Sequence, residues 1–291
     1  MIPNIKFYVI SIAAIFVALG IGIFVGFLLD AQNLIMDQRH DIITEIEERF
    51  DYLSEENKEL KEALESANDK NEDYEYFIDS TYKEIIKDKL AGVNVAIIET
   101  NNDYVYSSVG QLLEAAGANV VNLTTIMDTF SNEELLTSLY QELQIPLNTS
   151  HSVAADTARK LTESIIKGDM YELELKLDER GFINLVGPVN EHVDYIIVAG
   201  GSIEDSQDKI NIIDSTIINV AKSNSIPIVG VERVDANYSY MEAYKKLGIT
   251  TIDNVDTSIG KVSLILAMEG RPGHYGVKKT AEDLIPSLNI Q

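Results

Sequence analysis

Residues 7–29 read FYVISIAAIFVALGIGIFVGFLL and contain neither a charged residue nor a proline. An α-helix rises about 1.5 Å per residue, so this stretch makes a helix of about 34 Å, and the hydrocarbon core of a membrane is about 30 Å thick. A helix also satisfies its backbone hydrogen bonds within one segment, as lipid requires. We therefore predict a transmembrane helix over residues 7–29. A buried core helix, the alternative, would be shorter and less uniformly apolar.

A cleaved signal peptide is a second alternative to this anchor. The apolar core of a signal peptide is about 7–15 residues long and is followed by a cleavage site with two small residues. Here the apolar run is longer, and residues 26–32 read GFLLDAQ, without a good small-x-small pair at the apolar edge. We therefore expect the helix to remain as a single-pass anchor in the cell membrane.

The charges beside the anchor predict its orientation. Lys6 and the amino group of Met1 lie on the N-terminal side, whereas Asp30 and Asp37 follow the helix and Arg39 adds one positive charge there. Positive charges favour the cytoplasmic side, and a short N-terminal end usually stays in the cytoplasm. We predict that residues 1–6 are cytoplasmic and that the bulk of the chain is extracytoplasmic.

The composition narrows the class of partner. The chain has 291 residues and a formal net charge of −24, which argues against binding nucleic acid or an anionic lipid surface. Cysteine is absent, so an extracytoplasmic domain must rely on its apolar core rather than on disulfides. The residues that follow the anchor and its neighbouring segment are numerous enough to form one such core.

Apolar residues repeat at heptad spacing after the anchor, and neither glycine nor proline interrupts residues 31–90. The sequence predicts a coiled-coil stalk over residues 30–90, about 87 Å long if it is helical to residue 87. Asparagine at an a position favours a parallel pair of helices, because it can form a hydrogen bond with the same asparagine of the second helix. A single amphipathic helix on the protein's own domain is the alternative. The d positions are Ile46, Leu53, Leu60, Ala67 and Tyr74, and the a positions are Phe50, Asn57, Leu64, Asn71 and Ile78.

The anchor adds a second signal for pairing. Gly22 and Gly26 form a GxxxG motif, with Ala18 one step before it, and this spacing lets two membrane helices approach closely. Glycines that simply face lipid are the alternative. Taken with the heptads, the motif predicts a homodimer held through both the stalk and the transmembrane helix.

Beyond Gly92, short apolar runs alternate with helical stretches, which predicts a mostly parallel sheet covered by helices. We expect one doubly wound α/β domain of the Rossmann or flavodoxin type over residues 91–291. Ser131 is a plausible N-cap for the second helix. The expected strands are 93–100, 119–123, 182–186, 194–201, 226–231 and 250–252, and the expected helices are 105–116, 132–143, 151–167, 209–223, 238–247 and 258–268.

Ligands of such sheets bind at the carboxyl ends of the strands, where residues 99–103, 200–202 and 232–233 would lie. Gly200 and Gly201 could bind an anion, but they form no GxGxxG motif. The sequence contains no P-loop, GxSxG, HExxH or CxxC motif. Its histidines, at positions 40, 151, 192 and 274, lack ligand spacing, and its methionines form no cluster suited to copper(I). We predict no enzyme activity, no catalytic or metal-binding residue and no cofactor. The alternatives are a carboxylate–histidine site assembled by the fold and an envelope enzyme that uses the α/β domain.

The segment EGRPGHYGVK, at residues 269–278, is the most unusual part of the domain. Its glycines allow close backbone approach, and its proline limits the entropy lost on docking. We interpret it as a recognition loop, docked on a partner or on the domain itself. The alternative is a turn that carries the tail back over the domain, with His274 hydrogen-bonded locally. The loop residues are Gly270, Arg271, Pro272, Gly273, His274, Tyr275, Gly276 and Lys278.

The glycine-rich helix ALGIGIFVGFLL, the heptad stalk, the α/β domain and the terminal GHYGVKKTAEDLIPS together resemble the MctB-like copper transporter family. That family also contains the corynebacterial SteB-type proteins of the cell envelope and cell division. The resemblance implies either copper efflux or an envelope complex with a membrane partner, and it supplies no catalytic residues.

A single helix per chain cannot enclose a conducting path, and after Tyr8 only Ser11 interrupts the apolar surface of this one. We therefore predict a membrane-anchored, dimeric extracytoplasmic interaction module of the bacterial envelope, which scaffolds envelope or division machinery through a membrane or envelope protein partner. Copper transport or handling is the alternative that the family name implies.

Overall fold

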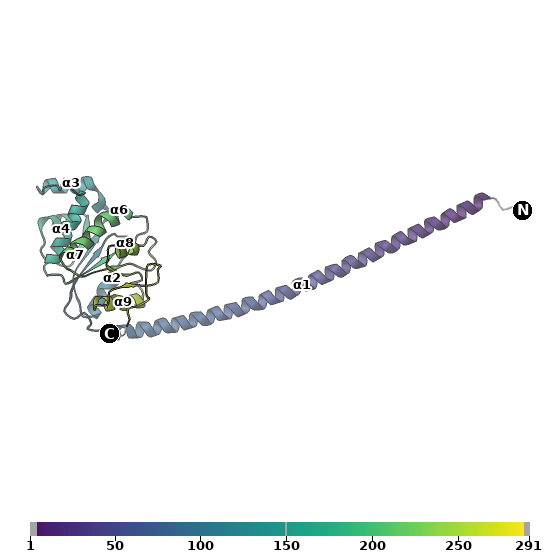
Figure 1. The fold of residues 1–291 in the computed structure, drawn as a ribbon, viewed down its shortest axis with the longest axis horizontal. Coiled ribbons are helices and arrows are strands. Elements are labelled where there is room, and N and C mark those ends of the chain that lie inside the picture. The colour runs from purple at the N-terminus through teal and green to yellow at the C-terminus, as the bar shows by residue number, and fades with distance from the viewer. Residues whose placement is uncertain (1–4, 149, 288–291) are drawn as a thin grey trace. The chain divides into compact units, whose positions relative to one another are not determined.

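The computed structural model describes residues 5–148 and 150–287. Met1 and the side chains of Asp30, Asp37, Arg39 and His40 lie outside that description. The first element, α1 (Ile5–Ile86), is one continuous helix that contains both the apolar stretch and the heptads (Figure 1). Within the described residues, Lys6–Leu29 is the one helical stretch long and apolar enough to cross a membrane.

The chain separates into two compact units, Met1–Asp73 and Tyr74–Gln291. The second unit contains the last turns of α1 together with a seven-stranded sheet of order β3-β2-β1-β4-β5-β6-β7. All neighbouring strands are parallel except β2 and β3, which are antiparallel. The strands are β1 (Asn94–Glu99), β2 (Asn119–Ile126), β3 (Ile183–Val186), β4 (Tyr195–Ala199), β5 (Ile228–Val231), β6 (Thr250–Ile252) and β7 (His274–Tyr275).

Helices cover both faces of the sheet, and each face has its own apolar core. One core lies beneath α3, α4, α5, α7 and α8, and the other lies beneath α2, α9 and the end of α1 (Figure 1). This is the doubly wound α/β architecture that the sequence predicts. The remaining helical elements are α2 (Ser107–Ala115), η1 (Asp128–Ser131), α3 (Glu133–Glu142), α4 (Val153–Lys167), α5 (Glu172–Glu179), α6 (Gln207–Lys209), the π-helix η2 (Ile210–Asp214), α7 (Ser215–Ser223), α8 (Met241–Lys246) and α9 (Ser258–Met268).

The helix ends follow the chemistry of their capping residues. Ser152 accepts a hydrogen bond from the backbone N–H of Ala155 at the start of α4, and Gly168 ends the same helix in the left-handed conformation. The N-cap of α3 is Asn132, whose side chain accepts from the N–H of Leu135. The prediction of Ser131 as that cap was wrong, because Ser131 ends the preceding turn η1.

Several elements differ from the sequence prediction. Helix α5 was not expected, because its charged sequence ELELKLDE has only two apolar positions that reach the core, Leu173 and Leu177. The helix predicted over residues 209–223 contains the π-turn η2 near its start. His274 and Tyr275, interpreted as part of a loop, form the short edge strand β7.

Candidate functional site at the carboxyl edge of the sheet

The strand order reverses between β1 and β4, and ligands of doubly wound sheets bind at the carboxyl ends of such a strand pair. The three loops predicted to meet there lie side by side. The N–H of Thr100 donates to the carbonyl of Ala199 at 2.9 Å, and the side-chain amide of Asn101 donates to the carbonyl of Gly201 at 2.8 Å. The N–H of Gly200 donates to Val231 at 2.9 Å, which brings the third loop to the same edge.

Aromatic side chains of the domain fill the space above Gly200. A Cβ atom added at Gly200 would lie 2.6 Å from Cδ2 of Tyr240 and would also overlap Tyr244. The hydroxyl of Tyr106 donates to the carbonyl of the same glycine. All three tyrosines are buried. This glycine therefore makes room for the protein's own rings, rather than exposing backbone N–H groups to an anion.

The start of α2 is the position where a Rossmann fold holds a phosphate. Here the buried carboxylate of Glu99 lies close to it. Glu99 accepts a hydrogen bond from the N–H of Tyr106, the N-cap of α2, at 3.1 Å and another from the hydroxyl of Thr125 at 2.5 Å. The protein's own carboxyl group therefore occupies a place beside this end of the helix.

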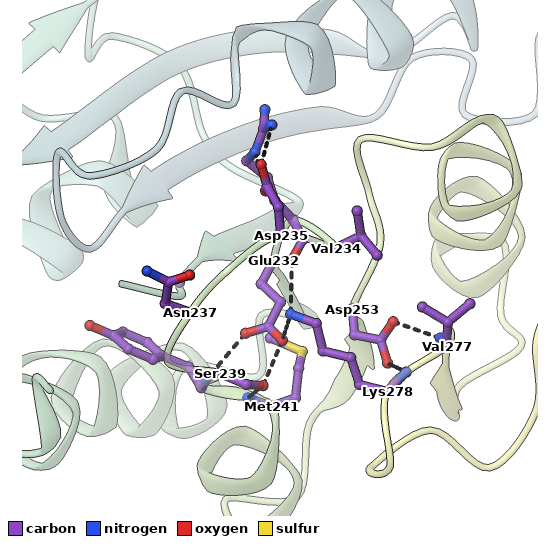
Figure 2. Close-up of polar contacts among 12 residues, drawn as sticks. Glu232, Val234, Asp235, Asn237, Ser239, Met241, Asp253, Val277 and Lys278 are labelled. Atoms are coloured by element: carbon purple, nitrogen blue, oxygen red, sulfur yellow. Dashed lines mark hydrogen bonds and ion pairs between the residues drawn. The ribbon is translucent and has the colours of Figure 1, made fainter. Parts of the chain in front are cut away.

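Glu232, directly after β5, is fully buried and is the centre of a polar cluster (Figure 2). Its carboxylate accepts from the ammonium of Lys278 at 2.8 Å and from the hydroxyl of Ser239 at 2.6 Å. The backbone N–H of Tyr240 donates to the same carboxylate at 2.9 Å. Burial raises the pKa of Glu232, and the hydrogen bonds from Lys278 and Ser239 oppose that rise.

The carboxylate of Asp253, directly after β6, is held by backbone donors. The N–H groups of Val277 and Lys278 both donate to it at 2.8 Å (Figure 2). Gly276 has a φ of 140°, and a Cβ atom there would overlap this carboxylate. The predicted loop residue Lys278 therefore binds two buried carboxylates of the domain itself, and Gly276 lets the chain pass close to one of them.

His274 and Tyr275 also contact the domain. Strand β7 pairs with β6, and the ring nitrogen Nδ1 of His274 lies 3.0 Å from the hydroxyl of Thr251. Burial, together with the charge of Lys245, lowers the pKa of His274. The hydroxyl of the buried Tyr275 donates to the carbonyls of Arg271 and Pro272 at 3.1 and 3.2 Å. These contacts match the alternative of a turn that carries the tail over the domain, and recognition of a partner stays a prediction.

Sequence reasoning missed Asp214, which ends the π-turn η2 and is fully buried. Its Oδ1 accepts from the hydroxyl of Tyr244, and no described residue bonds its Oδ2. Burial raises the pKa of Asp214 to about 6. The signal in the sequence is an acidic residue within the apolar run INIIDSTII at residues 210–218, where the helix faces the core.

The predicted dimerisation residues lie along α1. Gly22 and Gly26 have no heavy atom within 4 Å of an added Cβ in the described structure. The side-chain amide of Asn57 donates to the carbonyl of Leu53 at 3.0 Å. Most apolar members of the two seams are exposed, and each of the following has more than half of its surface accessible: Ile46, Phe50, Leu53, Leu60 and Leu64.

A family model described as copper transport outer membrane protein, MctB, matches residues 1–286. The chain belongs to the MctB family. The match covers the anchor, the stalk and nearly all of the α/β domain of this MctB family member, and it confirms the resemblance seen in the sequence. No curated protein sequence matches the chain.

The apolar stretch Lys6–Leu29 and the family's membrane description together make this MctB family member a membrane-anchored protein. Among the described residues, no group of three or more histidine, aspartate or glutamate side chains could hold a metal ion. The residues gathered at the carboxyl edge are instead carboxylates paired with donors of the same chain.

The Glu232–Lys278 pair gives a stability prediction. Lys278→Met leaves a buried carboxylate without its cation, and such a change costs about 3 kcal/mol or more in the free energy of unfolding. A buried carboxyl with a raised pKa contributes stability at low pH that is lost as the pH rises through its folded pKa. The deficit of the variant is therefore smaller at pH 5 than at pH 8, as measured by denaturant unfolding.

Lys279→Met is the matched control, because Lys279 is the adjacent residue and is exposed. The double variant Glu232→Gln/Lys278→Met should recover part of the loss, since no charge is then left buried. Equal stabilities for Lys278→Met and Lys279→Met at pH 8 would show that the ion pair does not hold the C-terminal segment.

Proposed function

We propose that this MctB family member is a dimeric interaction module of the bacterial cell envelope, anchored by α1 and held outside the cytoplasm. The observation that carries the proposal is the uncovered apolar seam of the stalk, on a helix whose other positions are mostly charged or polar. Moving a Leu, Ile or Phe side chain out of water stabilises a complex by about 1.5–3 kcal/mol. A second copy of the chain has the same apolar seam, so pairing of the two helices covers both seams.

The state of the carboxyl edge supports an interaction role rather than an enzyme. Tyr240 and Tyr244 fill the space over Gly200, and Tyr106 donates to the carbonyl of the same glycine. Glu99 lies at the start of α2. The acidic groups of this edge accept hydrogen bonds from the protein's own donors. Such a domain offers outer surfaces to a membrane or envelope protein, and scaffolding of envelope or division machinery fits that arrangement.

Copper handling is the second candidate, and the family description favours it. Copper(I) prefers thiolate and thioether ligands. The chain has no cysteine, and His274 bonds Thr251 within the domain. These observations give the interaction module the stronger physical support.

Copper titration of the full-length chain in detergent separates the two candidates. We expect no stoichiometric, high-affinity site for copper(I) in competition with a chelator, because the described residues offer no set of soft ligands. His274→Ala should leave the titration unchanged. Stoichiometric binding that His274→Ala abolishes would favour the copper function.

Leu53→Asp combined with Leu60→Asp tests the dimer. Both residues occupy d positions, so the double variant places unpaired charges in the apolar seam. We expect the full-length variant in detergent to shift to monomer by light scattering, with the melting temperature of the α/β domain unchanged. Tyr52→Asp, at the exposed c position, is the matched control and should stay dimeric. A double variant that dimerises with unchanged affinity would exclude the stalk as the interface.

Orientation is tested by a reporter fused after Gln291. The short N-terminal end with Lys6 favours the cytoplasm, so the C-terminal end should lie on the opposite side. A reporter enzyme that works only outside the cytoplasm should be active, and a strictly cytoplasmic reporter at the same position should be inactive. The reverse pattern would exclude an extracytoplasmic domain.

A further inference from the structure

The last turns of α1 use two different faces. Asp79, Tyr82 and Ile86, at helical spacing, point to the α/β domain: the hydroxyl of Ser258 donates to Asp79, Tyr82 packs on the core, and Ile86 is fully buried. Tyr74, Phe77 and Ile85 lie on another face and are exposed by 64, 65 and 44%. The domain therefore leaves a second apolar face of the same helix uncovered.

This uncovered face continues the heptad of the stalk. Tyr74 occupies a d position, Ile85 occupies an a position one heptad after Ile78, and Phe77 occupies the g position beside the seam. Ile78, the a residue between, is half-buried and lines a shallow hollow with Thr257 of the domain. Tyr74, Phe77 and Ile85 thus keep the seam exposed beside the domain over the last turns of α1.

We infer that two copies of α1 pair in parallel and in register as far as Ile85, so that the coiled coil holds the two α/β domains side by side at a fixed spacing. This inference rests on the dimer of the proposed function and deepens it, because it assigns the second copy to a surface of the α/β unit itself.

The charges beside the seam favour this register. In a parallel pair, a g residue faces the e residue five positions later in the partner. Glu56 then faces Lys61, and Lys70 faces Glu75, each pair occurring twice by symmetry. Within the described residues no ion pair engages Lys61 or Lys70, whereas Arg49 and Lys58 bond Glu45 and Glu55 of their own helix.

The asparagines point to the same register. In register, Asn57 and Asn71 each face their twins and can exchange hydrogen bonds. A shift of one heptad would instead place Asn57 against Leu64 and Leu64 against Asn71. Each such contact buries an unpaired amide against an apolar side chain, which is unfavourable.

Single cysteines test the inference directly, because the full-length chain has none. A disulfide forms only where two Cα atoms approach within about 7 Å, as at the a and d layers of a parallel pair. The variants Leu53→Cys, Tyr74→Cys and Ile85→Cys are oxidised in membranes with dithiodipyridine and run on non-reducing gels. We expect all three to give at least tenfold more covalent dimer than the controls Tyr52→Cys and Tyr76→Cys, which lie at exposed outer positions.

The possible outcomes separate the inference from the proposed function. If Leu53→Cys cross-links but Tyr74→Cys and Ile85→Cys do not, the two helices separate before they reach the domain. That outcome overturns the inference but agrees with the proposed dimer. Failure of all three seam variants would overturn both. Differently tagged chains carrying Leu53→Cys and Ile85→Cys, expressed together, should form no mixed dimer through these positions, and a mixed dimer would show an antiparallel pair.

Discussion

The helix α1 satisfies its own backbone hydrogen bonds, and this property lets one element serve three environments. In lipid, a helix also needs apolar side chains, and the stretch Lys6–Leu29 supplies them. In water, the helical backbone needs no neighbouring strand or helix, so the side chains determine which surfaces pack against the helix. At its end, Ile86 and its neighbours bury one face against the α/β domain.

The α/β domain shows how a fold known for ligand binding can be closed by its own side chains. Parallel strands bring polar residues to one edge, and in many proteins of this architecture the edge receives a nucleotide. Here the edge receives Tyr240, Tyr244 and the ammonium of Lys278. Fold and function are separate questions, and the filled edge is one reason why we propose a binding role for the outer surfaces of this domain.

The C-terminal segment closes part of the carboxyl edge of the sheet. Lys278 joins the loop after β5 to the strand region after β6, and Gly276 lets the chain pass close to Asp253. The residues that looked most like a recognition motif are thus largely used to attach the tail to the sheet. Pro272 and Val277 are exposed members of the segment, and Val277 lines a hollow beside the first turn of α9.

The sequence alone determined the anchor, the heptads and the doubly wound class, because these depend on local period and length: a charge-free run, a seven-residue repeat, and apolar strands alternating with helices. It also placed the three loops that meet at the carboxyl edge. Tertiary structure decided the partners of those loops. Residues distant in sequence decide three features of the edge. Gly200 faces Tyr240 rather than an anion, and Lys278 is paired with Glu232 rather than free. His274 lies in an edge strand rather than in a loop. Their pairing follows from burial, because a buried polar group is stabilised by a hydrogen-bond partner, and no local sequence pattern identifies that partner.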